Sequence, residues 1–280
     1  MDWGPPATPR KGPNPTGCCL PVTPRSPVSR NCGGKVYLVG AGPGPAELLT
    51  LKAAELLRSA DVVVYDRLIQ DDVLALAPPS AERIYMGKPV GRHESRQDEV
   101  NEILVSKARE GKRVVRLKGG DPFVLGRGGE EAEFLAQRGV PFEVIPGVSS
   151  ALAAPLRAGI PVTHRDVASC VVIATGHEAH KNEDRLDWVA LSKLDTLVFL
   201  MGVHNVGRIA ARLIEHGRDP ATPAALIQMA YWAEERVLVA TLANIAAEAE
   251  RSEVQPPATL VIGEVVRWCE RLRTGETRHG

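Results

Sequence analysis

The residues best suited to chemistry lie between Arg116 and Glu131, in the segment RLKGGDPFVLGRGGEE. Five of these sixteen residues are glycine, so the segment offers little side-chain surface to a core. Gly119 and Gly120 can adopt positive φ and let a ligand approach the backbone closely. The alternative is an ordinary turn between a strand and a helix, but such a turn needs fewer glycines. We therefore expect the backbone of this segment to contact a ligand.

A second glycine-rich segment, VGAGPG, follows an apolar run and has some features of a dinucleotide-binding loop. The G-x-G-x-x-G frame that starts at Gly40 places Pro45 where the third glycine is required. Asp66 could still bind a ribose, although it lies further along than the usual spacing of about 20 residues. We therefore do not expect NAD binding. Pro43 and Pro45 instead stiffen this loop, and Pro45 suits the first position of a helix.

Alternating strands and helices must position these two segments. KVYLVG predicts a buried strand at 35–40, residues 48–60 predict an amphipathic helix, and DVVVYD predicts a strand at 61–66. Strands that alternate with helices indicate mostly parallel sheets, and ligands lie beyond the carboxyl ends of such strands. Further strands are predicted at 84–86, 113–117, 142–145, 170–176, 196–202, 224–230, 236–242 and 258–263, and further helices near 99–109, 130–138 and 205–215.

The pattern predicts two α/β domains with mostly parallel sheets and a ligand-binding cleft between them. Three prolines interrupt the pattern near residues 147–163, so we place the N-terminal domain at 34–147 and the C-terminal domain at 148–272. Residues 1–33 hold eight of the 22 prolines and are predicted to be a disordered leader. Residues 273–280 are predicted to be a tail.

The overall charge is balanced, because Lys and Arg together number 34 and Asp and Glu together also number 34. No global field therefore attracts nucleic acid or an anionic membrane, and an acidic ligand must meet a local basic patch. No apolar stretch approaches the roughly 18 residues that span a bilayer, and the N-terminus lacks the apolar core of a secretory signal. We expect neither a nucleic-acid partner nor a membrane partner.

The five cysteines show neither disulfide nor metal-ligand spacing. Cys170 and Cys269 are isolated within predicted elements, and a reducing cytoplasm fits this usage best. His177 and His180 in TGHEAH do not form an H-E-x-x-H motif. We therefore expect no metal.

Together, these motifs resemble those of a known enzyme family. The matching segments are VYLVGAGPG, VVYDRL, GKPVGRH, RLKGGDPFVLGRGGEE, FEVIPGVSSA, GIPVTHRD, LVFLMG and ATLVIGEVV. They extend over roughly residues 35–267. The chain resembles the uroporphyrinogen-III C-methyltransferases of the tetrapyrrole methylase family, and we expect the stand-alone type without a fused dehydrogenase module.

The resemblance implies a reaction and its reactants. Such enzymes use S-adenosylmethionine to methylate uroporphyrinogen III at carbons 2 and 7, giving precorrin-1 and then precorrin-2. This product serves sirohaem and cobalamin biosynthesis, and the sequence leaves open which of the two pathways is supplied. The resemblance also implies a cytoplasmic homodimer with a small-molecule substrate.

By similarity, nine positions would contact the methyl donor: Pro43, Gly119, Gly120, Asp121, Val124, Ser149, Ser150, Met201 and Ala230. Glycine backbone permits close approach, Asp121 can accept hydrogen bonds, and Val124 and Met201 offer apolar or polarizable surface. From the sequence alone, a core position is the better interpretation of Met201, and Ser149 and Ser150 could simply cap a helix. Contacts near Ala230 stay open, because QMAYWAEERV departs from the usual family sequence.

The resemblance assigns proton transfer to Asp66 as acceptor and Lys88 as donor. Both follow predicted strands, so both are expected at one sheet edge. The methylated carbon must lose a proton, which calls for a nearby base. A surface ion pair is the alternative that the two residues would suggest without the resemblance.

A substrate with many carboxylates requires cations, and several lie in the loops of the matching segments. Arginine binds carboxylates through two parallel hydrogen bonds. The predicted substrate contacts are Arg67, Arg92, His93 and Arg165.

Two other functions share this fold. A related enzyme of the fold could methylate another precorrin or a macromolecule, and GKPVGRH and GIPVTHRD favour a tetrapyrrole over a macromolecule. A non-catalytic binding module is a further alternative. Loss of Asp66, Lys88 or the glycine segment would favour that alternative, and all three are present.

Overall fold

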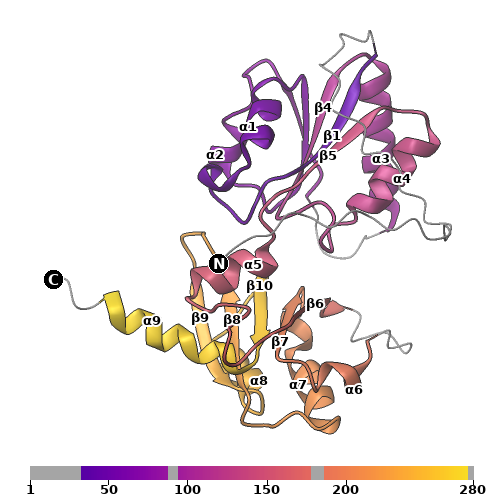
Figure 1. The fold of residues 1–280 in the computed structure, drawn as a ribbon. Coiled ribbons are helices and arrows are strands. Elements are labelled where there is room, and N and C mark those ends of the chain that lie inside the picture. The colour runs from indigo at the N-terminus through magenta and orange to yellow at the C-terminus, as the bar shows by residue number, and fades with distance from the viewer. Residues whose placement is uncertain (1–32, 88–93, 178–185, 277–280) are drawn as a thin grey trace, which may run out of the picture. The chain divides into compact units, whose positions relative to one another are not determined.

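The computed structural model describes residues 33–87, 94–177 and 186–276 of the 280-residue chain. Residues from Gly33 onward form one compact unit that contains two five-stranded sheets (Figure 1). No helix among the described residues is long and apolar enough to cross a membrane. The described residues also contain no cluster of three or more His, Cys, Asp or Glu side chains that could hold a metal ion.

The first sheet is parallel throughout and has the strand order β3-β2-β4-β1-β5. Helices cover both of its faces, with α1 and α2 on one side and α3 and α4 on the other (Figure 1). Both faces of β1 are buried. Alternate residues face opposite sides, so Tyr37 and Val39 pack in one core cluster and Val36 and Leu38 pack in the other. Burial on both faces explains the continuous apolar runs in the sequence. The elements are β1 (Lys35–Gly40), η1 (Ala46–Leu48), α1 (Leu51–Arg58), β2 (Val62–Tyr65), α2 (Asp71–Leu74), β3 (Glu82–Tyr85), α3 (Glu94–Arg109), β4 (Arg113–Lys118), α4 (Gly128–Gln137) and β5 (Phe142–Ile145).

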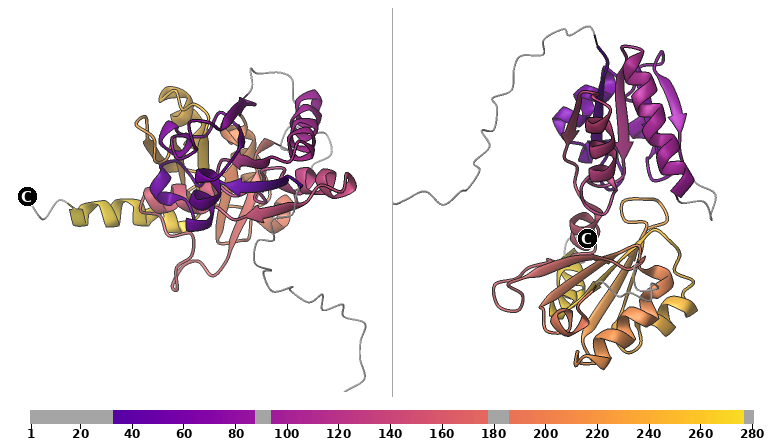
Figure 2. Two further views of the ribbon diagram at one scale, coloured as in Figure 1. Left: turned by 90° about the horizontal axis from the view of Figure 1, so that it is seen from above. Right: turned by 90° about the vertical axis from the view of Figure 1, so that its right-hand side faces the viewer.

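The second sheet has the order β6-β7-β10-β8-β9 and is mixed. Only β6 and β7 pair in parallel, whereas β10 is antiparallel to both β7 and β8, and β8 is antiparallel to β9. Helices α6, α7 and α8 pack on one face, and α5, η4 and the start of α9 pack on the other (Figure 2). The elements are α5 (Ser150–Arg157), β6 (Val171–Thr175), α6 (Trp188–Leu191), β7 (Thr196–Leu200), η3 (Val203–Asn205), α7 (Val206–Glu215), β8 (Pro223–Gln228), β9 (Arg236–Thr241), α8 (Ile245–Arg251), β10 (Ala258–Ile262), η4 (Glu264–Arg267) and α9 (Trp268–Glu276).

The predicted α/β class with mostly parallel strand pairs is confirmed across the two sheets taken together. Three pairs of the second sheet are antiparallel, and for one of them, β8 with β9, the length of the connection gives a physical reason. Residues 229–235 join β8 to β9, and a parallel crossover needs a dozen or more residues, so this connection can only make a hairpin.

The predicted domain boundary near residue 147 falls between β5, which ends the first sheet, and α5, which packs on the second sheet. The division of this compact unit into domains at 34–147 and 148–272 stays a prediction.

Candidate active site

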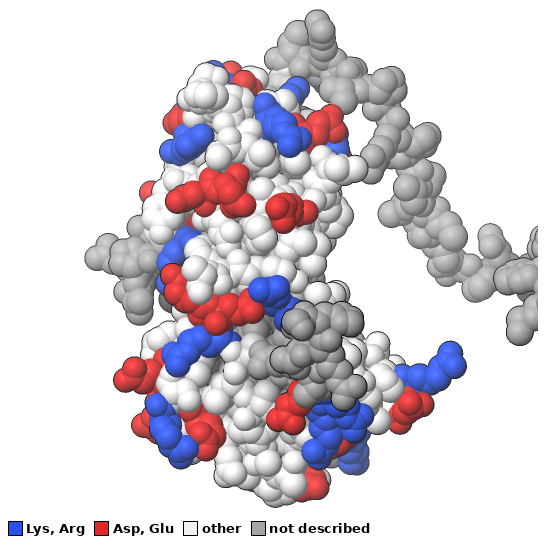
Figure 3. Space-filling view, turned by 90° about the vertical axis from the view of Figure 1, so that its left-hand side faces the viewer, with Lys and Arg blue, Asp and Glu red and all other residues white. Residues whose placement is uncertain are grey.

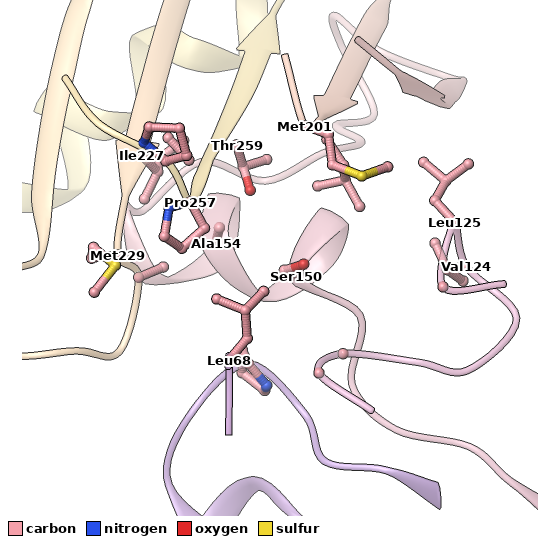
Figure 4. A pocket seen from close by; sticks show the side chains of 18 of the residues that line it. Leu68, Val124, Leu125, Ser150, Ala154, Met201, Ile227, Met229, Pro257 and Thr259 are labelled. Carbon is pink, nitrogen blue, oxygen red and sulfur yellow. The ribbon is translucent and has the colours of Figure 1, made fainter. Parts of the chain in front are cut away.

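A cavity of about 460 Å³ lies beyond the carboxyl ends of strands in the first sheet. Loops that follow β1, β2 and β4 line it, together with α5 and one edge of the second sheet (Figure 4). It brings together nine of the predicted site residues, which are Pro43, Asp66, Arg67, Gly119, Gly120, Val124, Ser150, Met201 and Ala230.

Glycine backbone forms the floor of the cavity at the end of β4. The Gly120 N–H donates to the Gly42 carbonyl at 2.7 Å, and the Gly42 N–H donates back to the Gly120 carbonyl at 3.2 Å. Both residues have positive φ, 71° at Gly42 and 69° at Gly120, which glycine adopts without strain. A Cβ on Gly147 would lie 2.3 Å from the Gly120 oxygen, so the loops after β1, β4 and β5 meet through bare backbone.

Asp121 braces this glycine backbone and is not among the residues that line the cavity. Its Oδ1 accepts from the Phe123 N–H at 2.8 Å, and its Oδ2 accepts from the Gly147 N–H at 3.1 Å. Its carboxylate therefore ties the loop after β4 to the loop after β5. In this structure Asp121 supports the glycine loop that is predicted to contact the methyl donor, and it does so from outside the cavity lining.

Asp66 lines the cavity and is the most exposed member of a network of four charged side chains. Its Oδ2 accepts from Nη2 of Arg116 at 2.8 Å. On the other side of Arg116, Nε donates to Oε1 of Glu131 at 3.2 Å, and Nζ of Lys118 donates to the same oxygen at 2.9 Å. Exposure falls from 37% for the Asp66 side chain to 4% for Arg116 and 0% for Glu131. The four groups alternate in sign, and the network reaches the cavity at both Asp66 and Lys118, which also lines it.

Burial and charge act in opposite directions on these groups. Burial would raise the pKa of Glu131, but the neighbouring Arg116 and Lys118 cations lower that pKa below its ordinary value. Burial is the largest cause of the lowered pKa of Lys118, and the positive charge of Arg116 adds to it. The pKa of Arg116 is raised, because Asp66 and Glu131 together outweigh the effect of burial.

Two methionines and a proline segment form the wall contributed by the second sheet. Met201 follows β7 and Met229 follows β8, and Figure 4 shows both side chains at the cavity. The interpretation of Met201 as a core residue is wrong, because it is 56% exposed and has a positive φ of 57°. Residues 256–259 also line the cavity, because antiparallel β10 begins at the edge where β8 ends, with Ala258 paired to Gln228.

The remaining predicted residues lie elsewhere. Ser149 is the N-cap of α5, where its side chain accepts from the Ala151 N–H at 3.2 Å, and it does not line the cavity. Arg165 is exposed in the turn bridged by His164 and Ala168 and is also absent from the cavity wall. Lys88, Arg92 and His93 lie outside the described residues.

Several functional candidates were missed by the sequence reasoning. Arg116 and Glu131 bounded the glycine segment but received no role. The alternation in β4 could have indicated one, because Val114, Arg116 and Lys118 share a face of the strand. His204 and Trp232 also line the cavity, and both follow strands of the second sheet. His204 lies in none of the matching segments, and Trp232 lies in QMAYWAEERV, the segment whose contacts the sequence left open.

Comparison with known proteins identifies the family. Residues 35–246 match the family described as Tetrapyrrole (Corrin/Porphyrin) Methylases. The chain is 55% identical over 249 residues to the S-adenosyl-L-methionine-dependent uroporphyrinogen III methyltransferase of Methanosarcina barkeri, covering 88% of this chain and 97% of that protein. It is 51% identical over 237 residues to the uroporphyrinogen-III C-methyltransferase of Methanocaldococcus jannaschii, covering 83% of this chain and 97% of the relative.

A solved structure shows the same fold. The uroporphyrin-III C-methyl transferase of Thermus thermophilus, complexed with S-adenyl homocysteine, superposes with a TM-score of 0.71 at 46% identity. The match covers 84% of this chain and 94% of that chain. On both sequence and fold, this chain belongs to the tetrapyrrole (corrin/porphyrin) methylase family.

Proposed function

We propose that this chain transfers methyl groups from S-adenosylmethionine to carbons 2 and 7 of uroporphyrinogen III, giving precorrin-2 by way of precorrin-1. The observation that carries the proposal is the single cavity lined both by the bare backbone of Gly119 and Gly120 and by the carboxylate of Asp66. The two relatives named as uroporphyrinogen III methyltransferases match this chain over 97% of their own length, which supports the same activity here.

The lining residues suit a sulfonium donor. A Cβ on Gly119 would lie 3.3 Å from Cβ of Leu68, so a side chain there would press against the next loop of the cavity wall. Met201 and Met229 add polarizable surface on the opposite wall. S-adenosylmethionine supplies an electrophilic methyl group when bound. The protein's main contribution to the rate is then to align donor and acceptor.

Asp66 is the proposed acceptor of the proton that the methylated carbon must lose. It lies at the cavity wall with its Oδ2 held by Arg116, so its orientation is fixed before a substrate arrives. Lys88 is the proposed proton donor, by resemblance alone. Arg67, Arg92, His93 and Arg165 are proposed to bind the substrate carboxylates, and of these Arg67 lines the cavity.

The test is direct conversion. Purified protein with S-adenosylmethionine and uroporphyrinogen III should give a dimethylated product, with the product mass counting the methyl groups added. With S-adenosylmethionine labelled in its methyl group, absence of label in the porphyrinogen would overturn the proposal. Methyl transfer to another precorrin but not to uroporphyrinogen III would instead indicate a related enzyme with that precorrin as its acceptor.

A macromolecular acceptor is less consistent with the charge pattern of the face drawn in Figure 3. On the face drawn in Figure 3, acidic and basic side chains outside the grey atoms are interspersed. This mixture agrees with the equal totals of 34 cationic and 34 anionic residues. A polyanionic small molecule requires cations only at the cavity.

We also infer a homodimer that works in the cytoplasm. The dimer rests on the family resemblance, and the compartment rests on isolated cysteines that suit a reducing environment. Light scattering of the purified chain and fractionation of the producing cell test the two inferences separately.

A further inference from the structure

We propose that Glu131 is a positioning residue for methyl transfer, acting through Arg116 to hold the Asp66 carboxylate in place at the cavity wall. This inference rests on the proposed function and extends it to a side chain that does not line the cavity.

The geometry leads in two steps from Glu131 to the cavity. Oε1 of Glu131 accepts from Nε of Arg116 at 3.2 Å, and Nη2 of the same guanidinium donates to Oδ2 of Asp66 at 2.8 Å. A guanidinium is planar and rigid, so fixing its Nε edge also fixes the direction in which Nη2 points. The position of the Asp66 carboxylate therefore depends on a residue on α4.

Strand parity explains why these side chains meet. Val64 pairs with Arg116 in the register of β2 and β4, and Val62, Val64, Val114 and Arg116 share the sheet face that α3 and α4 cover. Asp66 lies two residues after Val64, just beyond the end of β2, so its side chain is on the same face and contacts Arg116. Glu131 on α4 meets Arg116 from above that face.

Stability alone is a poor explanation for this network. Buried ion pairs often contribute little net stability, because desolvation opposes their attraction. Among the described residues, Nη1 of Arg116 and Oε2 of Glu131 are also buried without a hydrogen-bond partner, which is costly. A buried network that is incompletely satisfied and ends at a cavity is better explained by a role at that cavity.

The test compares turnover with donor binding. We expect Glu131→Gln to lower kcat by about 10- to 100-fold, because small misplacements of a reacting group have effects of this size. KM for S-adenosylmethionine should change by less than about 2-fold, since Glu131 does not line the cavity. Glu102→Gln is the matched control: it removes a carboxylate that pairs with Arg138 at the surface of α3, and it should leave both constants unchanged.

A double-mutant cycle separates positioning from general support. In an Asp66→Asn background, adding Glu131→Gln should lower the rate of label transfer by less than about 2-fold, because the group that Glu131 positions is already lost. Additive effects of the two changes would overturn the inference. So would wild-type kcat in Glu131→Gln.

A milder variant covers the case in which Glu131→Gln does not fold. Nε2 of Gln97 donates to the same Oε1 of Glu131 at 3.1 Å, so Gln97→Met should lower kcat by about 3-fold, with no further loss in the Asp66→Asn background. Persistence of the Gln97→Met effect in that background would contradict positioning. If the unchanged chain fails to methylate uroporphyrinogen III, the proposed function fails first, and this inference fails with it.

Discussion

Nε2 of Gln70 donates a hydrogen bond to the main-chain carbonyl of Tyr231, 3.0 Å away. The contact joins the chain after β2 to the loop after β8, and that loop supplies Met229, Ala230 and Trp232 to the cavity wall. A Cβ on Gly44 would lie 2.8 Å from the same Gln70 nitrogen, so the loop after β1 packs against this hydrogen bond. Three loops thus fix one side of the cavity.

Loss of the hydrogen bond between Gln70 and Tyr231 should weaken the binding of S-adenosylhomocysteine, the product that remains after the methyl donor has reacted. We expect Gln70→Met to weaken S-adenosylhomocysteine binding by about 5-fold, which corresponds to a net hydrogen bond of about 1 kcal/mol. Calorimetric titration measures the change. Gln137→Met on the exposed face of α4 is the matched control. Equal affinities for the Gln70 and Gln137 variants would show that this hydrogen bond does not order the cavity.

Gly147→Ala should destabilise the fold by about 3 kcal/mol, because the new Cβ would collide with backbone that cannot move aside. That Cβ would lie 2.3 Å from the Gly120 oxygen and 2.8 Å from the Gly40 backbone. Gly129→Ala on α4 has no atom within 4 Å of its Cβ and should be neutral or slightly stabilising. Urea unfolding of both variants makes the comparison. Similar stabilities would mean that the three glycine loops are packed less closely than described.

Asp121→Ala should act on the loop first and on ligand affinity second. The change removes the acceptor for the N–H groups of Phe123 and Gly147, and we expect a loss of about 2 kcal/mol in the free energy of unfolding. Affinity for S-adenosylhomocysteine should fall as the glycine backbone loosens. Weaker binding without any loss of stability would instead indicate direct contact between Asp121 and the donor.

The free energy of unfolding should depend on pH because the pKa of Glu131 is lowered in the folded chain. Its pKa in the folded chain lies below the ordinary value of 4.5, so its contribution is complete above that pH and is lost as the pH falls through the folded value. The free energy of unfolding should therefore drop more steeply between about pH 5 and pH 3 in the unchanged chain than in Glu131→Gln. Urea midpoints at several pH values test this. Parallel curves would contradict the lowered pKa.

The sequence predicted elements better than it predicted their directions. The strand at Lys35–Gly40 and the strand at Phe142–Ile145 were predicted to the residue, because continuous apolar runs between glycine and proline leave few alternatives. Strand direction depends on the length of the connections. The short link from β8 to β9 indicated a hairpin, yet the repeated alternation of strands and helices was extended to the second half of the chain.

The glycine loops and Asp66 were placed at the cavity correctly because their positions follow from strand ends in a parallel sheet. The network behind Asp66 could not be found in the same way. A lysine and an arginine in a strand read as solvent-facing residues unless their acidic partner is known, and Glu131 lies on a helix after the glycine segment. The proline wall was missed because its place depends on the reversed direction of β10.

The reversed direction of β10 determines which segment the second sheet contributes to the cavity. Residues 256–259 reach the cavity only through β10, and they lie beyond residue 246, where the family match ends. The loops after β1, β4 and β5 have no room for a side chain where they meet, since a single methyl group at Gly147 would collide with backbone. A change in the connection that precedes β10 would therefore alter the wall from the second sheet and leave the glycine backbone of the first sheet in place.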